Sequence, residues 1–297
     1  MIHVVGHTAI DHISRVPAFP PVNGSTTITD RKIYFGGGAA NIAAGIARLD
    51  VPCTLVSAVG GDFSGSEYDL WMKELAICQD FFVVDEAHTS TAFMFTDDHG
   101  DQITFFEWGA AAAFAGSEAK SYDFVHMATA DPDFNVQVAG KAKFSSFDPG
   151  QDLHRYTADH LYSIIPRISL LFANQHEVLE MCRKMELGRE ELVAMVPMAV
   201  FTMSEKGSIL YRDGEETHIP PVPVILKDPT GAGDAYRAGF LSAYWLGYPP
   251  LECCRIGTVS ASFTVESIGC QTNLPSWDDI RARYTRYFGE FYQVQAR

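Results

Sequence analysis

The sequence predicts an α/β protein with a mostly parallel central sheet, covered by helices on both faces, and a small β-strand lid. Short apolar runs rich in β-branched residues alternate with longer helical patterns along most of the 297 residues, which is typical of βαβ units. Two segments, at about 12–35 and 89–108, interrupt this alternation with extended patterns. Since no repeat, low-complexity tract or linker divides the chain, we expect one domain, 1–297, with these segments as the lid.

The expected elements follow in chain order. The first apolar run is a buried strand, the Ala and Ile residues of 39–49 recur at helical spacing, and the same two patterns then alternate to the C-terminal third. In the lid, the acidic, Gly-ended turn 97–100 joins two alternating runs into a hairpin. Strands are expected at 2–5, 54–59, 81–84, 124–127, 170–173, 199–202 and 208–211, and helices at 39–49, 65–75, 156–165, 175–185, 233–246 and 251–265.

The charge of the chain restricts its partners. With 37 acidic and 22 basic residues, the net charge is −15, which argues against a surface that binds nucleic acid. A small anionic ligand remains open, because backbone N–H groups and a metal hold phosphate without a basic patch. The six cysteines form no CxxC pair, so we expect buried thiols in a reducing compartment. Residues 1–14 do not resemble a signal peptide and 238–251 is too short to span a bilayer, so we expect a cytoplasmic protein with no membrane partner.

The first glycine-rich segment, 36–41, lies directly before an expected helix. Gly37 and Gly38 bring backbone N–H groups close to a ligand, and Asn41 adds an amide that pairs with hydroxyl groups. A tight strand-to-helix turn with no ligand explains the glycines equally well. The dinucleotide pattern GxGxxG fails because Asn41 occupies the position of the third Gly, and the chain contains no Walker A sequence.

The second glycine-rich segment, 228–234, opens the helix expected at 233–246. Gly231, Ala232 and Gly233 leave several N–H donors at the positive end of that helix, and Asp234 lies in its first turn. Helix capping alone explains the aspartate but not the small residues before it. A carboxylate beside such donors is an arrangement in which a base meets a group that develops negative charge, as phosphoryl transfer requires.

Two further sets of polar residues follow expected strands. Asn174 and Glu177 come after the strand at 170–173, at the ligand-binding edge of an open α/β sheet, where they would orient the waters of Mg²⁺. A capped helix start with an acidic first turn is the alternative. Asp11 follows the first strand by a few residues and would accept hydrogen bonds from a polyhydroxyl substrate, although a turn aspartate explains it too.

Together these segments resemble the ribokinase-like, PfkB family of ATP-dependent carbohydrate and nucleoside kinases. The segments that carry the resemblance cover nearly the whole chain in the family's order: 36–43, 59–65, 174–177 and 228–240, of which the last is the most specific. The resemblance implies a three-layer α/β/α sandwich with a β lid, and in-line transfer of the ATP γ-phosphoryl group to a primary alcohol.

The resemblance also implies residue roles. Asp234 would be the general base, with Gly231, Ala232 and Gly233 as the anion hole. The other implied roles are substrate binding by Asp11, Gly37, Gly38 and Asn41; support of ATP and Mg²⁺ by Asn174 and Glu177; nucleotide binding by the strand-loop that contains Thr202, Ser204, Lys206 and Gly207, where Ser204 replaces a more usual Gly; and a monovalent cation such as K⁺ near Asp228, Thr230 and the turn 267–269.

The lid contains more aromatic residues than a bare sugar needs. Phe93 and Phe105 are among them, and aromatic faces stack on nucleobases. Packing of the lid against the body or against a second subunit is the alternative. Since 101–110 and 270–275 also look like those of prokaryotic adenosine-kinase-like members, we expect a nucleoside kinase that phosphorylates the ribose 5′-hydroxyl of an adenosine-like substrate. The alternatives are a ribokinase- or fructokinase-type sugar kinase and a non-catalytic binding protein. An exposed lid edge favours a homodimer.

Overall fold

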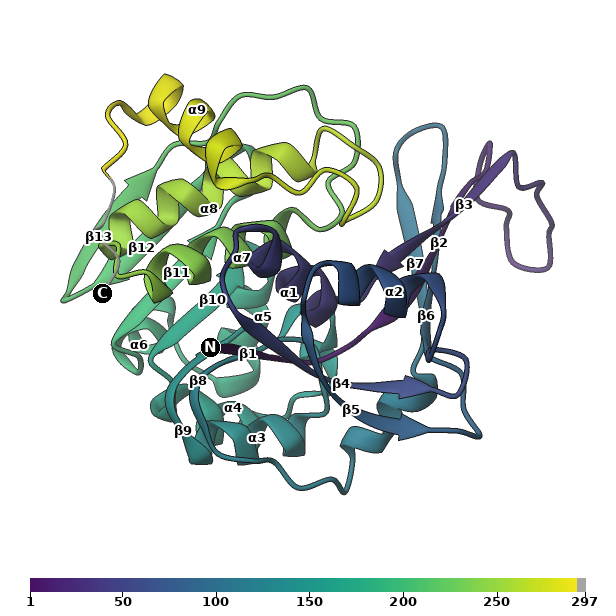
Figure 1. The fold of residues 1–297 in the computed structure, drawn as a ribbon, viewed down its shortest axis with the longest axis horizontal. Coiled ribbons are helices and arrows are strands. Elements are labelled where there is room, and N and C mark those ends of the chain that lie inside the picture. Colours follow the sequence, from purple (N-terminus) through teal and green to yellow (C-terminus); the bar gives the residue numbers. More distant parts are fainter. Residues whose placement is uncertain (293–297) are drawn as a thin grey trace.

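A nine-stranded sheet runs through the computed structural model, which describes residues 1–292 (Figure 1). Its order is β13-β12-β11-β10-β9-β8-β1-β4-β5, and all neighbours are parallel except β11–β12 and β12–β13. This confirms the mostly parallel sheet. The strands are β1 (Ile2–Val5), β4 (Cys53–Gly60), β5 (Cys78–Val84), β8 (Tyr122–Met127), β9 (Ala142–Phe147), β10 (Leu170–Asn174), β11 (Met198–Thr202), β12 (Ser208–Arg212) and β13 (Glu215–Ile219).

Helices cover both faces of this sheet because its strands are apolar on both sides. Neighbouring residues of one strand, such as Val4 and Val5, are both buried but belong to two separate apolar clusters. The first cluster packs under α1 (Gly38–Arg48), α2 (Glu67–Glu74), α7 (Ala232–Trp245), α8 (Pro250–Thr264) and α9 (Trp277–Phe288); the second packs under α3 (Pro132–Lys141), α4 (Ala158–Ile164), α5 (Gln175–Met185) and the short α6 (Arg189–Ala194). The 3₁₀ turns are η1 (Gly109–Phe114), η2 (Gly150–Arg155), η3 (Ile165–Arg167) and η4 (Ser204–Lys206).

A second sheet, the lid sheet, stands beside the carboxyl end of β1 (Figure 1). It comes from the two segments that break the α/β alternation. Its strands are β2 (Ala9–Arg15), β3 (Asp30–Gly36), β6 (Ser90–Thr96) and β7 (Gln102–Glu107), in the order β3-β2-β6-β7. The pairs β2–β3 and β6–β7 are antiparallel, whereas β2 and β6 are parallel.

Several elements escaped the sequence analysis. The predicted strands and helices are present with bounds shifted by a few residues, but α3, β9, α6, β13 and α9 were not predicted. The polar residues of β9 obscured its pattern: Ser146 is buried because its hydroxyl bonds to Nδ1 of His126 on the neighbouring strand, 2.9 Å away. Asp11 lies within β2 rather than in a turn after the first strand.

The cysteines are only partly as expected. All six are free thiols, and four are buried, but Cys78 is exposed at the start of β5 and Cys182 is half-buried on α5. Within residues 1–292 no helix is long and apolar enough to cross a membrane.

Candidate active site

The N-terminus of α7 is built around glycine. Gly231 precedes the helix with φ of 79°, a left-handed conformation that glycine adopts without strain. A Cβ at Gly231 would also lie 2.8 Å from the Cys270 side chain, so the position has no room for a larger residue. The first N–H groups of a helix have no carbonyl partners within it, and the helix dipole makes this end positive. Gly231 and Gly233 therefore offer backbone donors suited to an anion, whereas the Ala232 N–H, predicted to be a third donor, already donates to the Pro229 carbonyl oxygen at 3.2 Å.

Asp234 lies in this first turn, between two donors. Asn41 Nδ2 on α1 donates a hydrogen bond of 2.9 Å to Asp234 Oδ2, and the Arg237 guanidinium lies 3.7 Å from Oδ1. Arg237 is itself buried and pairs with Asp148 at 2.6 Å. Burial raises the pKa of Asp234 to about 6, although Arg237 and the Asn41 hydrogen bond oppose this shift. Asp234 is thus ionised at neutral pH yet able to hold a proton, as a general base must be.

The lid sheet brings Asp11 toward the same place. Asp11 is buried, and its burial together with the negative charges of Asp234 and Asp228 raises its pKa to about 7. A Cβ at Gly36 would lie 2.1 Å from the Asp11 carboxylate, and a Cβ at Gly38 would lie 3.8 Å from Asp234 Oδ1. Small residues therefore separate the two carboxylates. The structure therefore brings Asp11, Gly37, Gly38 and Asn41, the residues predicted to bind substrate, close to Asp234.

Phe93 and Phe105 do not point to this place. In the lid sheet, Asp11 is in register with Ala92 and then Phe106, whereas His12 is in register with Phe93 and then Phe105. Side chains in register share a face and successive residues alternate, so Phe93 and Phe105 lie on the face opposite Asp11. Their predicted contact with substrate in the same subunit is not supported; Phe106 lies on the Asp11 face instead.

Asn174 and Glu177 form a capping box at the start of α5. Asn174 Oδ1 accepts the backbone N–H groups of His176 and Glu177, and Glu177 Oε2 accepts the N–H of Asn174 at 2.7 Å. Burial and the nearby Asp148 raise the pKa of Glu177 to about 7. Residues 1–292 contain no group of three or more His, Cys, Asp or Glu that would hold a metal directly. The local excess of carboxylates fits a hydrated Mg²⁺ held through water.

The predicted nucleotide loop lies beside this capping box. Thr202 ends β11 and is in register with Asn174 at the end of β10. Ser204 has φ of 52°, a conformation that favours glycine, and Gly207 has φ of 85° with no space for a Cβ, which would lie 2.1 Å from the Ile219 carbonyl oxygen. Lys206 ends the 3₁₀ turn between them. The backbone thus keeps the glycine-type turn even where the sequence has Ser204.

Asp228 connects the segment before α7 to the turn after α8. Its Oδ1 accepts the N–H of Thr230 at 2.9 Å, and its Oδ2 accepts the N–H of Gly269 at 3.3 Å. The two segments predicted to hold a monovalent cation are therefore in contact. All of the sites described lie near the carboxyl ends of β1, β10 and β11, where open α/β sheets bind ligands.

Comparison with known proteins identifies the family. The model of the pfkB family of carbohydrate kinases matches residues 1–277. The chain belongs to this family. It is therefore a phosphotransferase that acts on a hydroxyl group.

Individual relatives cover nearly the whole kinase. A nucleoside kinase from Methanocaldococcus jannaschii is 42% identical to this chain, and the alignment covers 96% of this chain and 97% of the relative. The crystal structure of the nucleoside kinase of that organism, an archaeal member of the ribokinase family, matches with a TM-score of 0.92 and covers 96% of this chain and 98% of the other. Two more distant structures share the fold: a Burkholderia thailandensis nucleoside kinase with inosine (24% identity, TM-score 0.88, covering 97% and 99%) and an Arabidopsis thaliana ribokinase with ribose and ATP (20%, 0.81, covering 95% and 98%).

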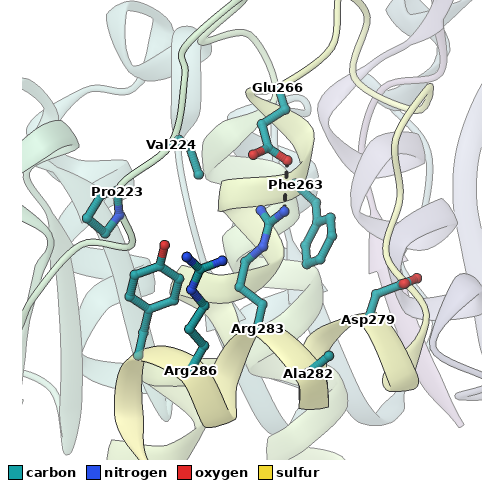
Figure 2. A pocket seen from close by; sticks show the side chains of 9 residues that line it. Pro223, Val224, Phe263, Glu266, Asp279, Ala282, Arg283 and Arg286 are labelled. Atoms are coloured by element: carbon teal, nitrogen blue, oxygen red, sulfur yellow. Dashed lines mark hydrogen bonds and ion pairs between the residues drawn. The ribbon is translucent and has the colours of Figure 1, made fainter.

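A pocket of about 350 Å³ in this kinase lies away from the candidate active site. Its walls come from α8, α9 and the segment that contains Pro223 and Val224, and they include none of the predicted site residues (Figure 2). Arg283 crosses the pocket to pair with Glu266 at 2.9 Å and stacks over Phe263. The candidate active site is therefore the group of carboxylates and N–H groups described above, and not this pocket.

Sequence reasoning missed several residues around Asp234. Arg237 follows Asp234 by three positions in the same helix. Residues at this spacing lie on one helix face, so the sequence could have indicated that the two charges are neighbours. Asp148 follows the unpredicted β9, so its place at the sheet edge was hidden. Gln271, which bonds to Asn41, is far from Asn41 in sequence, and no local pattern connects them.

Proposed function

We propose that this kinase transfers the γ-phosphoryl group of ATP to the 5′-hydroxyl of a nucleoside, with an adenosine-like nucleoside as acceptor. The observation that carries the proposal is Asp234: a half-buried carboxylate in the first turn of α7, directly after the glycine turn and close enough to Asp11 for its charge to raise the pKa of Asp11. A base and a phosphoryl site on the same helix end place the proton acceptor and the anion donors within one turn of each other.

The proposed reaction uses this geometry in one step. The acceptor 5′-oxygen attacks the γ-phosphorus, its proton passes to Asp234, and the bond from the γ-phosphorus to the β–γ bridging oxygen breaks to release ADP. The N–H groups of Gly231 and Gly233 stabilise the transferred phosphoryl group. When bound, Mg²⁺ neutralises charge on the polyphosphate, and Asn174 and Glu177 would hold its waters. Asp11 and Asn41 orient the ribose hydroxyls. We further propose that Asp228 and Thr230 line a site for a monovalent cation such as K⁺.

The nucleoside acceptor is favoured by aromatic side chains on the Asp11 side of the lid. Phe106 shares the face of Asp11, and the buried His7 packs against Phe106 and Trp108 with ring centroids 5.0 and 4.6 Å apart. His7 is held by Asp152 at 2.8 Å. Such a wall suits a planar base, which a free sugar lacks. The 42% identity with an archaeal nucleoside kinase supports the same acceptor class.

We also propose a homodimer formed by the outer face of the lid sheet, the face opposite Asp11. Phe105, Ile33 and Ile103 lie on this face with 62%, 56% and 42% of their surfaces exposed. Exposed apolar residues on one face of a sheet favour a protein partner. Light scattering would show a dimer for the wild type and a monomer for Phe105→Glu, whereas Leu179→Glu, an equally exposed position on α5, would remain dimeric. A monomeric wild type would contradict this part of the proposal.

The acceptor and the base are tested together. Steady-state rates with ATP and Mg²⁺ would be measured on a panel of nucleosides and free sugars, and we expect turnover on purine nucleosides. Asp234→Asn should lower kcat by about a hundredfold to ten-thousandfold, since general-base catalysis contributes that much. Turnover of free sugars alone would indicate a sugar kinase. No turnover on any acceptor would indicate a binding protein, and full activity of Asp234→Asn would remove this residue from the mechanism.

A further inference from the structure

A chain of hydrogen bonds, buried at its centre, leads from α2 to Asp234. Trp71 Nε1 on α2 donates to Gln271 Oε1 at 3.0 Å, Gln271 Nε2 donates to Asn41 Oδ1 at 2.9 Å, and Asn41 Nδ2 donates to Asp234 Oδ2 at 2.9 Å. Gln271 and Asn41 are both buried. The chain joins three helices and the segment after α8, which are far apart in sequence.

The direction of each hydrogen bond in this chain follows from the Trp71 indole, its first donor. The indole N–H of Trp71 is a donor only, so the Gln271 atom that faces it must be the amide oxygen. The Gln271 NH₂ group then faces Asn41, and the facing atom of Asn41 must be its oxygen. Asn41 is left with its NH₂ group toward Asp234, whose ionised carboxylate only accepts. The indole thus fixes the orientation of two amides and delivers a donor to the carboxylate.

A branch of the same chain reaches the lid. Gln271 Nε2 also lies 2.7 Å from the Tyr68 hydroxyl, which accepts this bond and donates its own proton to the Gly36 carbonyl at 2.8 Å. Gly36 ends β3 and lies against the Asp11 carboxylate. A single amide therefore supports both the candidate base and the backbone beside the residue predicted to bind the acceptor.

We propose that Gln271 and Trp71 are positioning residues for phosphoryl transfer: they hold the Asn41 amide in the one orientation that donates to Asp234. This inference rests on the proposed function for its catalytic consequence. Without this chain of hydrogen bonds from Trp71 through Gln271 to Asn41, which we call the relay, the Asn41 amide is free to turn its oxygen toward the Asp234 carboxylate. That orientation destabilises the ionised form of Asp234. The base then holds its proton to higher pH, and less of it is active at neutral pH.

The test compares Gln271→Met and Trp71→Phe with the wild type. Met keeps the length of the Gln271 side chain and removes all three hydrogen bonds of its amide, to Trp71, Asn41 and Tyr68. Phe keeps an aromatic ring at position 71 and removes only the indole N–H. For Gln271→Met we expect kcat to fall about tenfold or more at neutral pH, and the acidic limb of the kcat/KM profile to move up by about one pH unit. Trp71→Phe should show a smaller shift in the same direction. The KM for ATP should change little in both.

Trp277→Phe is the matched control. Trp277 is half-buried like Trp71 and donates its indole N–H to the Leu49 carbonyl at 2.7 Å, remote from Asp234. If an indole hydrogen bond served only to stabilise the fold, both Trp variants would be less stable than the wild type, and the pH profiles of both would be unchanged. An unmoved acidic limb in folded Gln271→Met would overturn the proposal.

The inference is also testable without turnover. The carboxyl carbon of Asp234 can be titrated by NMR in ¹³C-aspartate-labelled protein, with Asp234→Asn assigning the signal. We expect Asp234 to titrate at higher pH in Gln271→Met than in the wild type or Trp277→Phe. If the wild type phosphorylates no acceptor, the proposed function fails, while this titration still decides whether the relay acts on Asp234. Equal titration in the wild type and Gln271→Met would refute the relay even in an active kinase.

Discussion

The Arg237–Asp148 pair offers a sharp test of how the candidate site is held together. Arg237 lies on α7 one turn after Asp234, is buried, and pairs with Asp148 at 2.6 Å while standing 3.7 Å from Asp234. Replacement by Met keeps most of the volume but removes the positive charge that opposes the raised pKa of Asp234. The buried Asp148 and the half-buried Asp234 then lack this compensating charge.

The expected loss is large because the pair is buried. Removal of one partner of a buried ion pair costs about 3–5 kcal/mol, so we expect Arg237→Met to lower the free energy of unfolding by about this amount at pH 7. The double variant Arg237→Met/Asp148→Asn should recover part of the loss, because the new amide would carry no charge and its oxygen would still accept the N–H of Gly150, which bonds to Asp148 at 3.1 Å. The pKa of Asp234 should rise above about 6 in the single variant, and less in the double variant, since the Asp148 charge also raises it.

Urea unfolding and kcat/KM profiles measure the two effects separately. The acidic limb should lie at lowest pH in the wild type, higher in the double variant and highest in Arg237→Met. Unfolding should place the double variant between the wild type and Arg237→Met. A single variant within about 1 kcal/mol of the wild type, with an unmoved acidic limb, would refute the view that Arg237 compensates these carboxylates.

Three further predictions concern the lid and the loops. The folded-state pKa of Asp11 is raised from 3.8 to about 7, so its ionisation costs stability. Between about pH 5 and pH 8, the free energy of unfolding of the wild type should therefore fall by about 2–3 kcal/mol relative to that of Asp11→Asn, as measured by urea unfolding. A difference between the two proteins that does not change with pH would contradict this. Ser204→Gly should raise the free energy of unfolding by about 0.5–1 kcal/mol, because φ is 52° there; a loss of stability would show that the serine makes a compensating contact. Gly36→Ala should raise the KM for the acceptor about tenfold or more and leave the KM for ATP unchanged, because the new methyl group displaces the Asp11 carboxylate. The control Gly140→Ala, which has open space around it, should change neither KM value.

Local signals explain what the sequence predicted well. The Ala and Ile spacing of α1 and the small residues before α7 lie within one element each, so periodicity and composition reveal them. The misses have local causes as well. Asp131 accepts the N–H groups of Asp133 and Phe134 and is followed by Pro132 at the first position of α3. An Asp followed by a Pro is typical of a helix start, but the sequence analysis did not use this signal. β9 is an exception, because its Ser146 is a polar residue whose partner, His126, lies on another strand.

The sequence by itself determined the alternation of strands and helices, the glycine turn, and the carboxylate at its end, because each depends on residues within a few positions of one another. Which lid aromatics share the face of Asp11 was decided by tertiary structure. The alternation of β6 and β7 can be read from the sequence, but only pairing with β2 shows that Phe106, not Phe105, lies on that face. The relay through Gln271 likewise exists only after folding. Hydrogen bonds have no sequence period, so two amides 230 positions apart meet only when α1, α2 and the segment after α8 pack together.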